Sequence, residues 1–334
     1  MLISAETLDD LLIKIYKRII EKGHQTKPTR GAAKELIGAL VELKNPRARL
    51  SRTEGRGVLF SCLGELLWYL SKSNRLDFIK FYISGYEKNS DDGKTIYGAY
   101  GPRIFKKNCI DQFENVFKLL KKNPESRKAV IQLFDAIDIV KHHSDVPCTC
   151  TLQFFVRRKK LFLLTNMRSN DAYLGLPHDI FCFTMIQEIM AKRLDLELGT
   201  YKHFVGSLHL YDDDLKKADR IISEGFFEKK FMPDMPSEDP MPSIKIMLQL
   251  EQKIRKGEEV SLTELKLNPY WKDLLRLIKI FSLYKNRQGK EMRKQIDSIQ
   301  SEMSHQIYDT YIERKKHTKK PVTKEYQRDL PYQP

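Results

Sequence analysis

The stretch from Val146 to Tyr211 is the part of the sequence whose pattern restricts the fold most. Residues 151–157 and 160–166 alternate apolar and polar side chains on either side of a basic turn, which predicts a β-hairpin. Residues 174–193 then form a long, mostly apolar stretch that is typical of a helix, and residues 200–208 return to a strand-like pattern. This succession of strand, strand, helix and strand indicates a fold in which helices accompany a sheet.

The rest of the chain gives mainly helical patterns. In residues 7–20 apolar side chains recur every three or four positions, which is typical of an amphipathic helix. Residues 35–43 fit a helix or a strand equally well by pattern alone, and residues 129–134 indicate a buried strand. Prolines and acids mark residues 231–242 as a linker. Further helices are predicted at residues 58–70, 110–122, 211–222, 244–255 and 262–283, followed by a polar helix or a disordered tail.

Composition limits the class of protein. The 334 residues include 41% hydrophobic ones, enough for a full core, and no apolar run reaches the ~18–20 residues needed to span a bilayer. The N-terminal residues carry acids early and lack a basic region followed by an apolar one, so a cytoplasmic location is predicted. The five cysteines are scattered and do not suggest a disulfide framework, which agrees with a reducing compartment.

A net charge of +15 favours anionic partners, either a phosphorylated small molecule or a nucleic acid. Much of the excess lies in residues 285–290 and 314–320 near the C-terminus. Surfaces that bind single strands usually interleave basic residues with aromatic ones for stacking, and few aromatic residues lie near these two segments. The preferred interpretation is therefore a solvated tail and helix face, and binding of nucleic acid is not expected.

Several side chains with useful chemistry fall in or near the central stretch. Cys148 is a candidate nucleophile, and a guanidinium such as that of Arg168 lowers the pKa of a neighbouring thiol. Cys148 and Cys150 lack a second ligand pair at zinc-site spacing, so no metal is predicted. Glu65 stands alone in the apolar residues 58–70, where a carboxylate is costly unless it is paired or hydrogen-bonded. Taken singly, Cys148 fits a buried structural thiol better, and Glu65 fits a structural or a catalytic role equally well.

The order and spacing of four short motifs resemble the thymidylate synthase family. They are Glu-Leu-Leu-Trp-Tyr-Leu at residues 65–70, Pro-Cys at 147–148, Arg-Ser-x-Asp at 168–171 and Leu-Gly-Leu-Pro-His-Asp at 174–179. The resemblance covers about residues 26–225 and implies an α/β (α+β) fold, a mixed β-sheet packed with helices, with residues 35–43 as a strand. It also implies a homodimer, a catalytic domain at residues 1–230 and a helical, basic C-terminal extension at residues 231–334.

The resemblance further implies a reaction and its participants. Family members carry a one-carbon unit from 5,10-methylenetetrahydrofolate to C5 of a pyrimidine nucleoside monophosphate, after a cysteine thiolate has added to C6. By resemblance, Cys148 is the nucleophile, and Glu65 organises water and relays protons at the ring. Phosphate contacts are implied for Arg168, Ser169 and Arg30, and for Arg127 and Lys128, with Arg127 reaching into the partner's site. Folate contacts are implied for Trp68, Asp171 (which also lies near the ring), Leu174 and Gly175, and sugar contacts for His209 and Tyr211.

Some positions leave a choice open or depart from the family pattern. Arg47, Arg49 and Arg52 rival Arg30 as the arginine that closes on the phosphate, because they lie in a segment dense in arginine and glycine. Thr149 stands where histidine is common in the family, and Ser207 stands in place of an aspartate. Both departures put a plain thymidylate synthase activity in doubt.

Asp179 departs from the uracil-reading pattern in an informative way. An asparagine at this place accepts from N3–H of uracil and donates to O4, whereas cytosine presents an acceptor at N3 and a donor at its 4-amino group. A carboxyl group accepts from that amino group and shares its proton with N3, and family members that hydroxymethylate cytidylates carry aspartate here. The sequence therefore predicts C5 hydroxymethylation of CMP or dCMP with water as the final reactant. Methylation of dUMP and a non-catalytic, nucleic-acid-binding member are the alternatives, and the choice of ribose or deoxyribose stays open.

Overall fold

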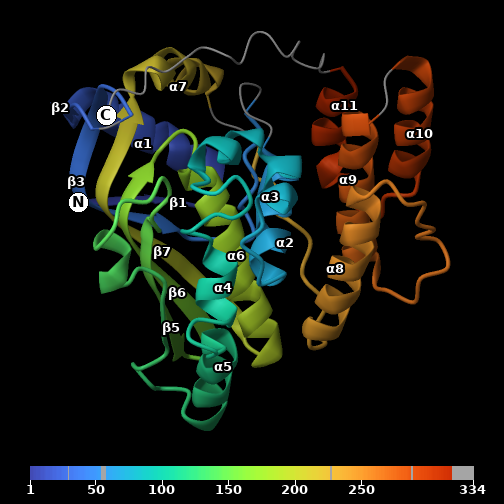
Figure 1. The fold of residues 1–334 in the computed structure, drawn as a ribbon, viewed down its shortest axis with the longest axis horizontal. Helices are drawn as coiled ribbons and strands as arrows, with labels where there is room; N and C mark the ends of the chain where they lie inside the picture. Colours follow the sequence, from blue (N-terminus) through green and yellow to red (C-terminus); the bar gives the residue numbers. More distant parts are fainter. Residues whose placement is uncertain (29, 54–57, 226–227, 287–288, 318–334) are drawn as a thin grey trace.

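The computed structural model describes residues 1–28, 30–53, 58–225, 228–286 and 289–317, which form one mixed sheet covered by helices (Figure 1). The strand order is β1-β3-β7-β6-β5-β4, and β2 pairs with the first three residues of β3. The pairs β1–β3 and β6–β7 are parallel and the others are antiparallel. The strands are β1 (Leu2–Ala5), β2 (His24–Thr26), β3 (Ala33–Leu43), β4 (Val130–Gln132), β5 (Thr149–Arg157), β6 (Lys160–Asp171) and β7 (Glu197–Tyr211).

The long helix α6 (Leu176–Arg193) packs on β6 and β7, and α2 (Leu59–Leu70) packs on α6 (Figure 1). Around them lie α1 (Leu8–Lys22), α3 (Leu76–Tyr82), α4 (Tyr100–Phe105), α5 (Gln112–Lys122) and α7 (Asp212–Glu224). The C-terminal helices are α8 (Met241–Arg255), α9 (Pro269–Asn286), α10 (Gly289–Ser301) and α11 (Asp309–His317), and they gather on the side of α2 away from the sheet. Short 3₁₀ turns are η1 (Ser84–Asn89), η2 (Ala136–Ile139) and η3 (Gln306–Tyr308).

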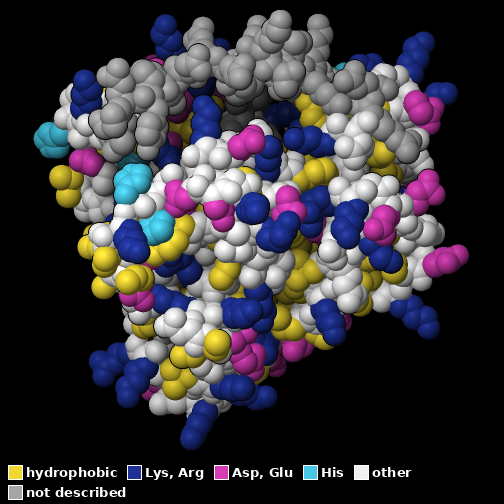
Figure 2. All heavy atoms as spheres, in the orientation of Figure 1, with side chains coloured by type: hydrophobic (Ala, Val, Ile, Leu, Met, Phe, Trp, Pro, Cys, Tyr) yellow, Lys and Arg dark blue, Asp and Glu magenta, His cyan; other side chains and the backbone are white. Residues whose placement is uncertain are grey.

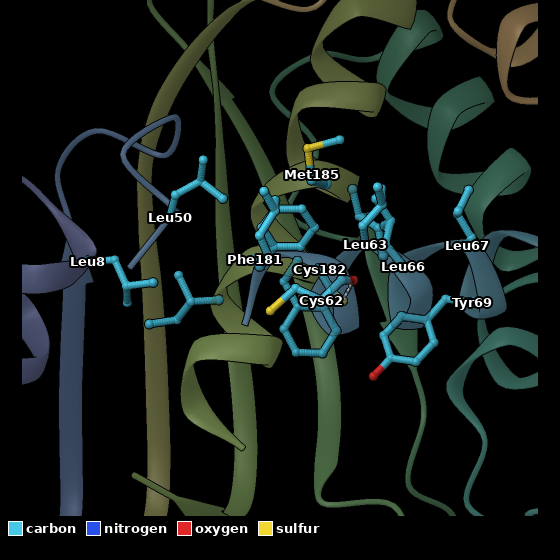
Figure 3. Packing of buried hydrophobic residues seen from close by; sticks show 14 of the residues in the cluster. Leu8, Leu50, Cys62, Leu63, Leu66, Leu67, Tyr69, Phe181, Cys182 and Met185 are labelled. Carbon is cyan, nitrogen blue, oxygen red and sulfur yellow. Dashed lines mark hydrogen bonds between the residues drawn. The ribbon is translucent and has the colours of Figure 1, made fainter. Parts of the chain in front are cut away.

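The interface between α2 and α6 forms the centre of the core. Every residue of α2 except Ser61 is buried, because this helix is apolar on nearly all sides, and nearly all of α6 is buried as well, with buried polar side chains such as Glu188 paired inside the fold. Figure 3 shows Phe181 and Met185 of α6 facing Leu63 and Leu66 of α2. Their burial removes large apolar side chains from water, each a gain of about 1.5–3 kcal/mol. This pair of helices carries three polar side chains of the site, Glu65 on α2 and His178 and Asp179 on α6.

Most of the predicted elements are confirmed. Residues 35–43 form a strand, as the resemblance favours, because β3 pairs with both β1 and β7. The hairpin at residues 151–166 is present as β5 and β6. The strand predicted at residues 129–134 is shorter, since β4 covers only Val130–Gln132 at the sheet edge, where Val130 is exposed. The helix predicted from residue 262 begins only at Pro269, where the Asn268 side chain accepts from the Tyr270 N–H.

The helical C-terminal residues pack against the body of the fold. Tyr311 donates a hydrogen bond to the Ser51 carbonyl, and Arg314 donates to the carbonyls of Arg52 and Thr53. Lys316 pairs with Asp297 and Glu313 inside the same extension. Part of the basic C-terminal charge is therefore engaged within the chain. The division into domains at residue 230 stays a prediction.

Lysine and arginine side chains are spread over the whole face that Figure 2 draws, with acids among them. On this face the positive charge does not gather into one stripe of the kind that would follow a nucleic-acid backbone. The helices of the described ranges include none that is long and apolar enough to cross a membrane.

The three rival arginines are paired with acids away from Cys148. Arg49 is fully buried in an ion pair with Glu188, which also accepts the backbone N–H of Met235. Arg47 pairs with Asp234 at 3.1 Å, and Arg52 lies 3.7 Å from Asp9. The arginine-rich segment thus makes ion pairs with acids of α1 and α6 and with Asp234, which lies before α8.

Arg49→Met is expected to lower the free energy of unfolding by about 3–5 kcal/mol, because it leaves the Glu188 carboxylate buried without its partner. The measurement is urea denaturation, with Arg75→Met as the control, since Arg75 forms an exposed pair with Asp77 and its loss should change nothing measurable. Replacing both partners, in Arg49→Met with Glu188→Leu, should recover most of the loss. A single variant as stable as the control would contradict this account of the pair.

Candidate active site

Cys148 lies just before β5 and next to Arg168 of the neighbouring strand β6. The Arg168 Nη2 is 3.7 Å from the Cys148 Sγ, and the backbone N–H of Arg168 donates to the Cys148 carbonyl at 2.9 Å. The guanidinium is held by the carbonyls of Pro147 and Val146, at 3.0 and 2.9 Å. The antiparallel register of Thr149 with Met167 brings these two side chains together. The predicted pairing of cysteine and arginine is therefore present.

The surroundings of the Cys148 thiol nevertheless favour its protonated form. Burial raises the pKa of Cys148 to about 11, although the Arg168 charge opposes the shift, and nearby carboxylates add to it. The Arg168 guanidinium lowers the pKa of Cys148, as expected, but by less than burial raises it. A thiolate forms more readily once the local negative charge falls or a ring is there to accept the thiol's electrons.

Tyr100, the first residue of α4, also borders the nucleophile. Its hydroxyl accepts the Thr149 N–H at 3.2 Å, and the Cys148 charge contributes to its raised pKa after burial and Asp179. The other tyrosine of the same loop, Tyr97, donates instead to Asp138, which Arg103 also binds. Of the two tyrosines, Tyr100 therefore borders the nucleophile, whereas Tyr97 belongs to the Asp138 cluster.

Glu65 of α2 is the centre of a buried hydrogen-bond network. Its Oε1 accepts from the hydroxyls of Tyr69 at 3.0 Å and Tyr86 at 2.7 Å, and its Oε2 lies 2.6 Å from the His178 Nδ1. The other ring nitrogen of His178 is 3.3 Å from the Ser61 hydroxyl. The isolated carboxylate of the apolar helix is therefore fully satisfied. Neither Tyr86 nor His178 was singled out from the sequence.

Glu65 and His178 form an ion pair. Burial alone would raise the pKa of Glu65, but the hydrogen bond and charge of His178 bring it below its ordinary value. For His178 burial acts in the opposite sense, and the interactions with Cys62 and Glu65 overcome it and raise the pKa. The lowered pKa favours a negative charge at Glu65 of α2, and this charge acts on Asp179 of the neighbouring helix α6.

Asp179 is buried and held by one donor. The Asn170 Nδ2 lies 2.7 Å from the Asp179 Oδ2 and 2.9 Å from the Met167 Sδ. Burial and then the charge of Glu65 raise the pKa of Asp179 to about 8, so the carboxyl is mostly neutral at pH 7. Within the described ranges its Oδ1 has no hydrogen-bond partner. Asp179 thus presents a neutral carboxyl group to a pyrimidine ring, with its Oδ2 bound by Asn170 and its Oδ1 available.

The other predicted residues line the ends of β6 and β7. The Asp171 Oδ1 accepts the N–H groups of Tyr173 and Leu174 at 2.8 and 2.9 Å, which turns the chain into α6 at Gly175. Asp171 is the register partner of His209, and the His209 ring meets the Tyr211 ring edge-on at 5.0 Å. Ser169 lies opposite Ser207, which donates to Glu35 of β3. Leu174 is exposed, while Trp68 is 1% exposed and packs against Tyr86 and Tyr69.

The predicted phosphate residues fall into two groups. Arg30 is exposed, and its charge acts on Cys148, Asp145 and Tyr211, which puts it at the same site as Arg168. Arg127 and Lys128 are exposed next to the edge strand β4, and in the described part of the chain their side chains make no ion pair. Their predicted contact with a partner's site stays a prediction.

A family model described as thymidylate synthase matches residues 12–273. The chain belongs to the thymidylate synthase family. This confirms the recognition and the predicted fold class, and the mixed sheet agrees with both. Members of this family transfer one-carbon units with methylenetetrahydrofolate as co-substrate. The predicted one-carbon transferase class and the predicted folate co-substrate are therefore confirmed at the level of the family.

Among known proteins, the chain is 32% identical over 218 residues to a deoxyuridylate hydroxymethyltransferase of Bacillus phage SP01. That alignment covers 61% of this chain and 57% of the phage protein, so the chain spans just over half of this relative's length. It is also 29% identical over 217 residues to a thymidylate synthase of Buchnera aphidicola, an alignment that covers 63% of this chain and 82% of that enzyme.

Proposed function

We propose that this protein is a cytidylate 5-hydroxymethyltransferase, which acts on CMP or dCMP with 5,10-methylenetetrahydrofolate and water. The observation that carries the proposal is the state of Asp179, a buried and mostly neutral carboxyl anchored through one oxygen by Asn170. Cytosine needs one donor toward N3 and one acceptor toward its 4-amino group. A neutral carboxyl supplies both, whereas an ionised one would supply acceptors only.

Asn170 decides which oxygen of Asp179 keeps the proton. Because the Oδ2 accepts from the Asn170 amide, the proton belongs on the Oδ1, from which it can be donated to N3 of the ring. The Oδ2 has a second lone pair for the 4-amino group. The negative charge of Glu65 favours the protonated form of Asp179. The hydrogen-bond network that keeps Glu65 charged therefore helps Asp179 to recognise cytosine.

The remaining residues serve the covalent chemistry. Arg168 and Ser169, together with Arg30, bind the phosphate and so hold C6 of the ring over the Cys148 sulfur. The Cys148 thiolate adds to C6, which makes C5 nucleophilic toward the one-carbon unit. Glu65, in its network with Tyr86 and His178, positions water and moves the protons that this addition and the later elimination require. Trp68, Asp171, Leu174 and Gly175 form the folate side of the site, and His209 with Tyr211 contacts the sugar.

Hydroxymethyl transfer is favoured over methyl transfer by the phage relative, whose name describes the hydroxymethylation of deoxyuridylate. Methylation of dUMP is the alternative, and the Buchnera relative is named for thymidylate synthesis. Incubation with CMP, dCMP and dUMP plus methylenetetrahydrofolate, followed by product mass, separates these reactions. We expect a mass increase of one hydroxymethyl group on a cytidylate. Turnover of dUMP alone would contradict the cytosine assignment, and a methyl product would contradict the role of water.

The proposal includes a homodimer in which Arg127 reaches the partner's phosphate. Arg127→Ala and Cys148→Ala are each expected to be inactive, and mixing them after mild dissociation should restore about a quarter of the wild-type activity. Half of the randomly formed dimers are mixed, and each of those has one complete site. The measurement is product formation before and after mixing. Activity that stays at zero in a mixture shown to contain mixed dimers would contradict a shared site.

A further inference from the structure

Asp145 is a carboxylate at the site to which the proposed function gives no role. It stands three residues before Cys148, in the segment whose next two carbonyls, those of Val146 and Pro147, hold the Arg168 guanidinium. Its carboxyl lies against Gly98: a Cβ at residue 98 would come 2.5 Å from the Asp145 Oδ2. Glycine at this position therefore leaves the space that the carboxyl occupies, since any larger residue would push it aside.

The groups around the Asp145 carboxyl are those of the reacting centre. The charges of Arg30, Arg103, Glu65 and Arg168 all act on it, and its own charge raises the pKa of Cys148. Burial raises the pKa of Asp145 to about 6, with Arg30 as the main opposing charge. The carboxyl is thus close to both the nucleophile and the proton relay, and it is mostly ionised at pH 7.

No donor from the described residues binds the Asp145 carboxyl. The contrast with other acids of this region is clear: Asp138 is bound by Tyr97 and Arg103, and Asp91 by His143 and the Ser144 N–H. A largely buried carboxylate without a protein donor is costly unless water or a ligand supplies the hydrogen bond. The position is therefore suited to holding a water molecule beside the reacting ring.

We propose that Asp145 is the base that takes the proton from the water completing hydroxymethyl formation. The inference rests on the proposed function, because a methyl product would require no such water. After C5 has received the one-carbon unit and the folate amine has left, the ring carries an exocyclic methylene at C5 and the Cys148 sulfur at C6. The water oxygen bonds to the methylene carbon, and its proton passes to Asp145. The electron pair of the exocyclic double bond moves to C5–C6 and expels the Cys148 thiolate, and Asp145 then releases its proton to solvent.

The test separates the steps before and after the entry of water. With cytidylate labelled by tritium at C5, the release of tritium reports the early steps, and the hydroxymethyl product reports the last one. Asp145→Asn should lower hydroxymethyl formation by about 10²–10⁴-fold, the usual contribution of a general base, while single-turnover tritium release stays within about threefold. The covalent adduct on Cys148 should accumulate and be detected as a protein of increased mass. Asp145→Glu, which restores a carboxylate, should recover part of the lost product.

Asp77→Asn is the matched control, because Asp77 is an exposed acid of α3 that pairs with Arg75 and has no proposed role in the reaction. It should leave both measurements unchanged. Hydroxymethyl formation by Asp145→Asn within threefold of wild type would overturn the inference, and so would an equal fall in tritium release and product. A wild-type protein that makes no hydroxymethyl product from any of the three nucleotides would overturn the proposed function itself, which is a different outcome.

Discussion

Asp179→Asn is expected to change the base preference of the protein by at least ~10³-fold in the ratio of kcat/KM for cytidylate over deoxyuridylate. An amide is a far weaker acid than a neutral carboxyl. It can no longer give a proton to N3 as charge develops there, a loss of about 10²–10⁴-fold in rate. The amide also brings an N–H donor that suits O4 of uracil. The fall in kcat/KM for cytidylate and the rise in kcat/KM for deoxyuridylate therefore both lower the ratio.

Asn170 determines how far activity toward deoxyuridylate rises. In the present arrangement its amide donates to residue 179, which would hold the new asparagine with its carbonyl toward Asn170. Reading uracil requires the opposite orientation, so Asn170 must turn its own amide and present its Oδ1, which is buried without a partner among the described residues. Adding Asn170→Ala to Asp179→Asn removes this restraint and should raise activity toward deoxyuridylate further.

The control for Asp179→Asn is thermal unfolding. The pKa of Asp179 is raised to about 8, so folding favours the protonated acid, and stability is lost as pH rises from about 4 to about 8. The amide carries no such cost, so Asp179→Asn should unfold at a temperature no lower than the wild type, with the difference growing toward pH 8. An unchanged ratio of kcat/KM in a stable variant would contradict the reading of cytosine by Asp179.

The motifs that lie close together in sequence were the most predictable part of the site. Cys148 and Arg168 meet because Cys148 directly precedes β5 and Arg168 lies on β6, the other strand of the hairpin, and hairpin pairing follows from local alternation. Asp171 lies beside His209 because β6 and β7 are parallel neighbours, which the family resemblance implies but periodicity does not. The fold class was predicted from the family resemblance, and the succession of long strand and helix patterns agreed with it.

The partners that decide protonation were not predictable from the sequence. Glu65 and His178 are separated by 113 positions, and nothing in either local pattern indicates that the two side chains meet. Arg49 and Glu188 are 139 positions apart, so the sequence left Arg49 among the rivals of Arg30 for the phosphate, whereas it forms an internal ion pair. Each such contact depends on the packing of α2 or of the N-terminal segment against α6. Periodicity predicts which face of a helix is buried, but it does not predict which polar side chain of another element contacts that face.

Cys148→Ala is expected to abolish product formation, with a loss on the order of 10⁴-fold or more, because no other group can add to C6 and activate C5. Tritium release from C5 should disappear as well, since it follows the addition. Cys150→Ala is the matched control: Cys150 is two positions away and half-buried, and burial raises its pKa. It should keep activity within about threefold of wild type, as expected of an ordinary packing residue.

Binding separates the chemical role of Cys148 from a structural one. The Arg168 guanidinium is held by the carbonyls of Pro147 and Val146 at 3.0 and 2.9 Å, contacts that do not involve the sulfur. Cys148→Ala should therefore leave the phosphate site intact and bind cytidylate with a Kd within about tenfold of wild type, measured by calorimetry. Removing a thiol whose pKa is raised to about 11 also removes no charge from the free protein at pH 7. A variant that loses binding and turnover together would show that the cysteine shapes the pocket, whereas retained turnover would place the nucleophile elsewhere.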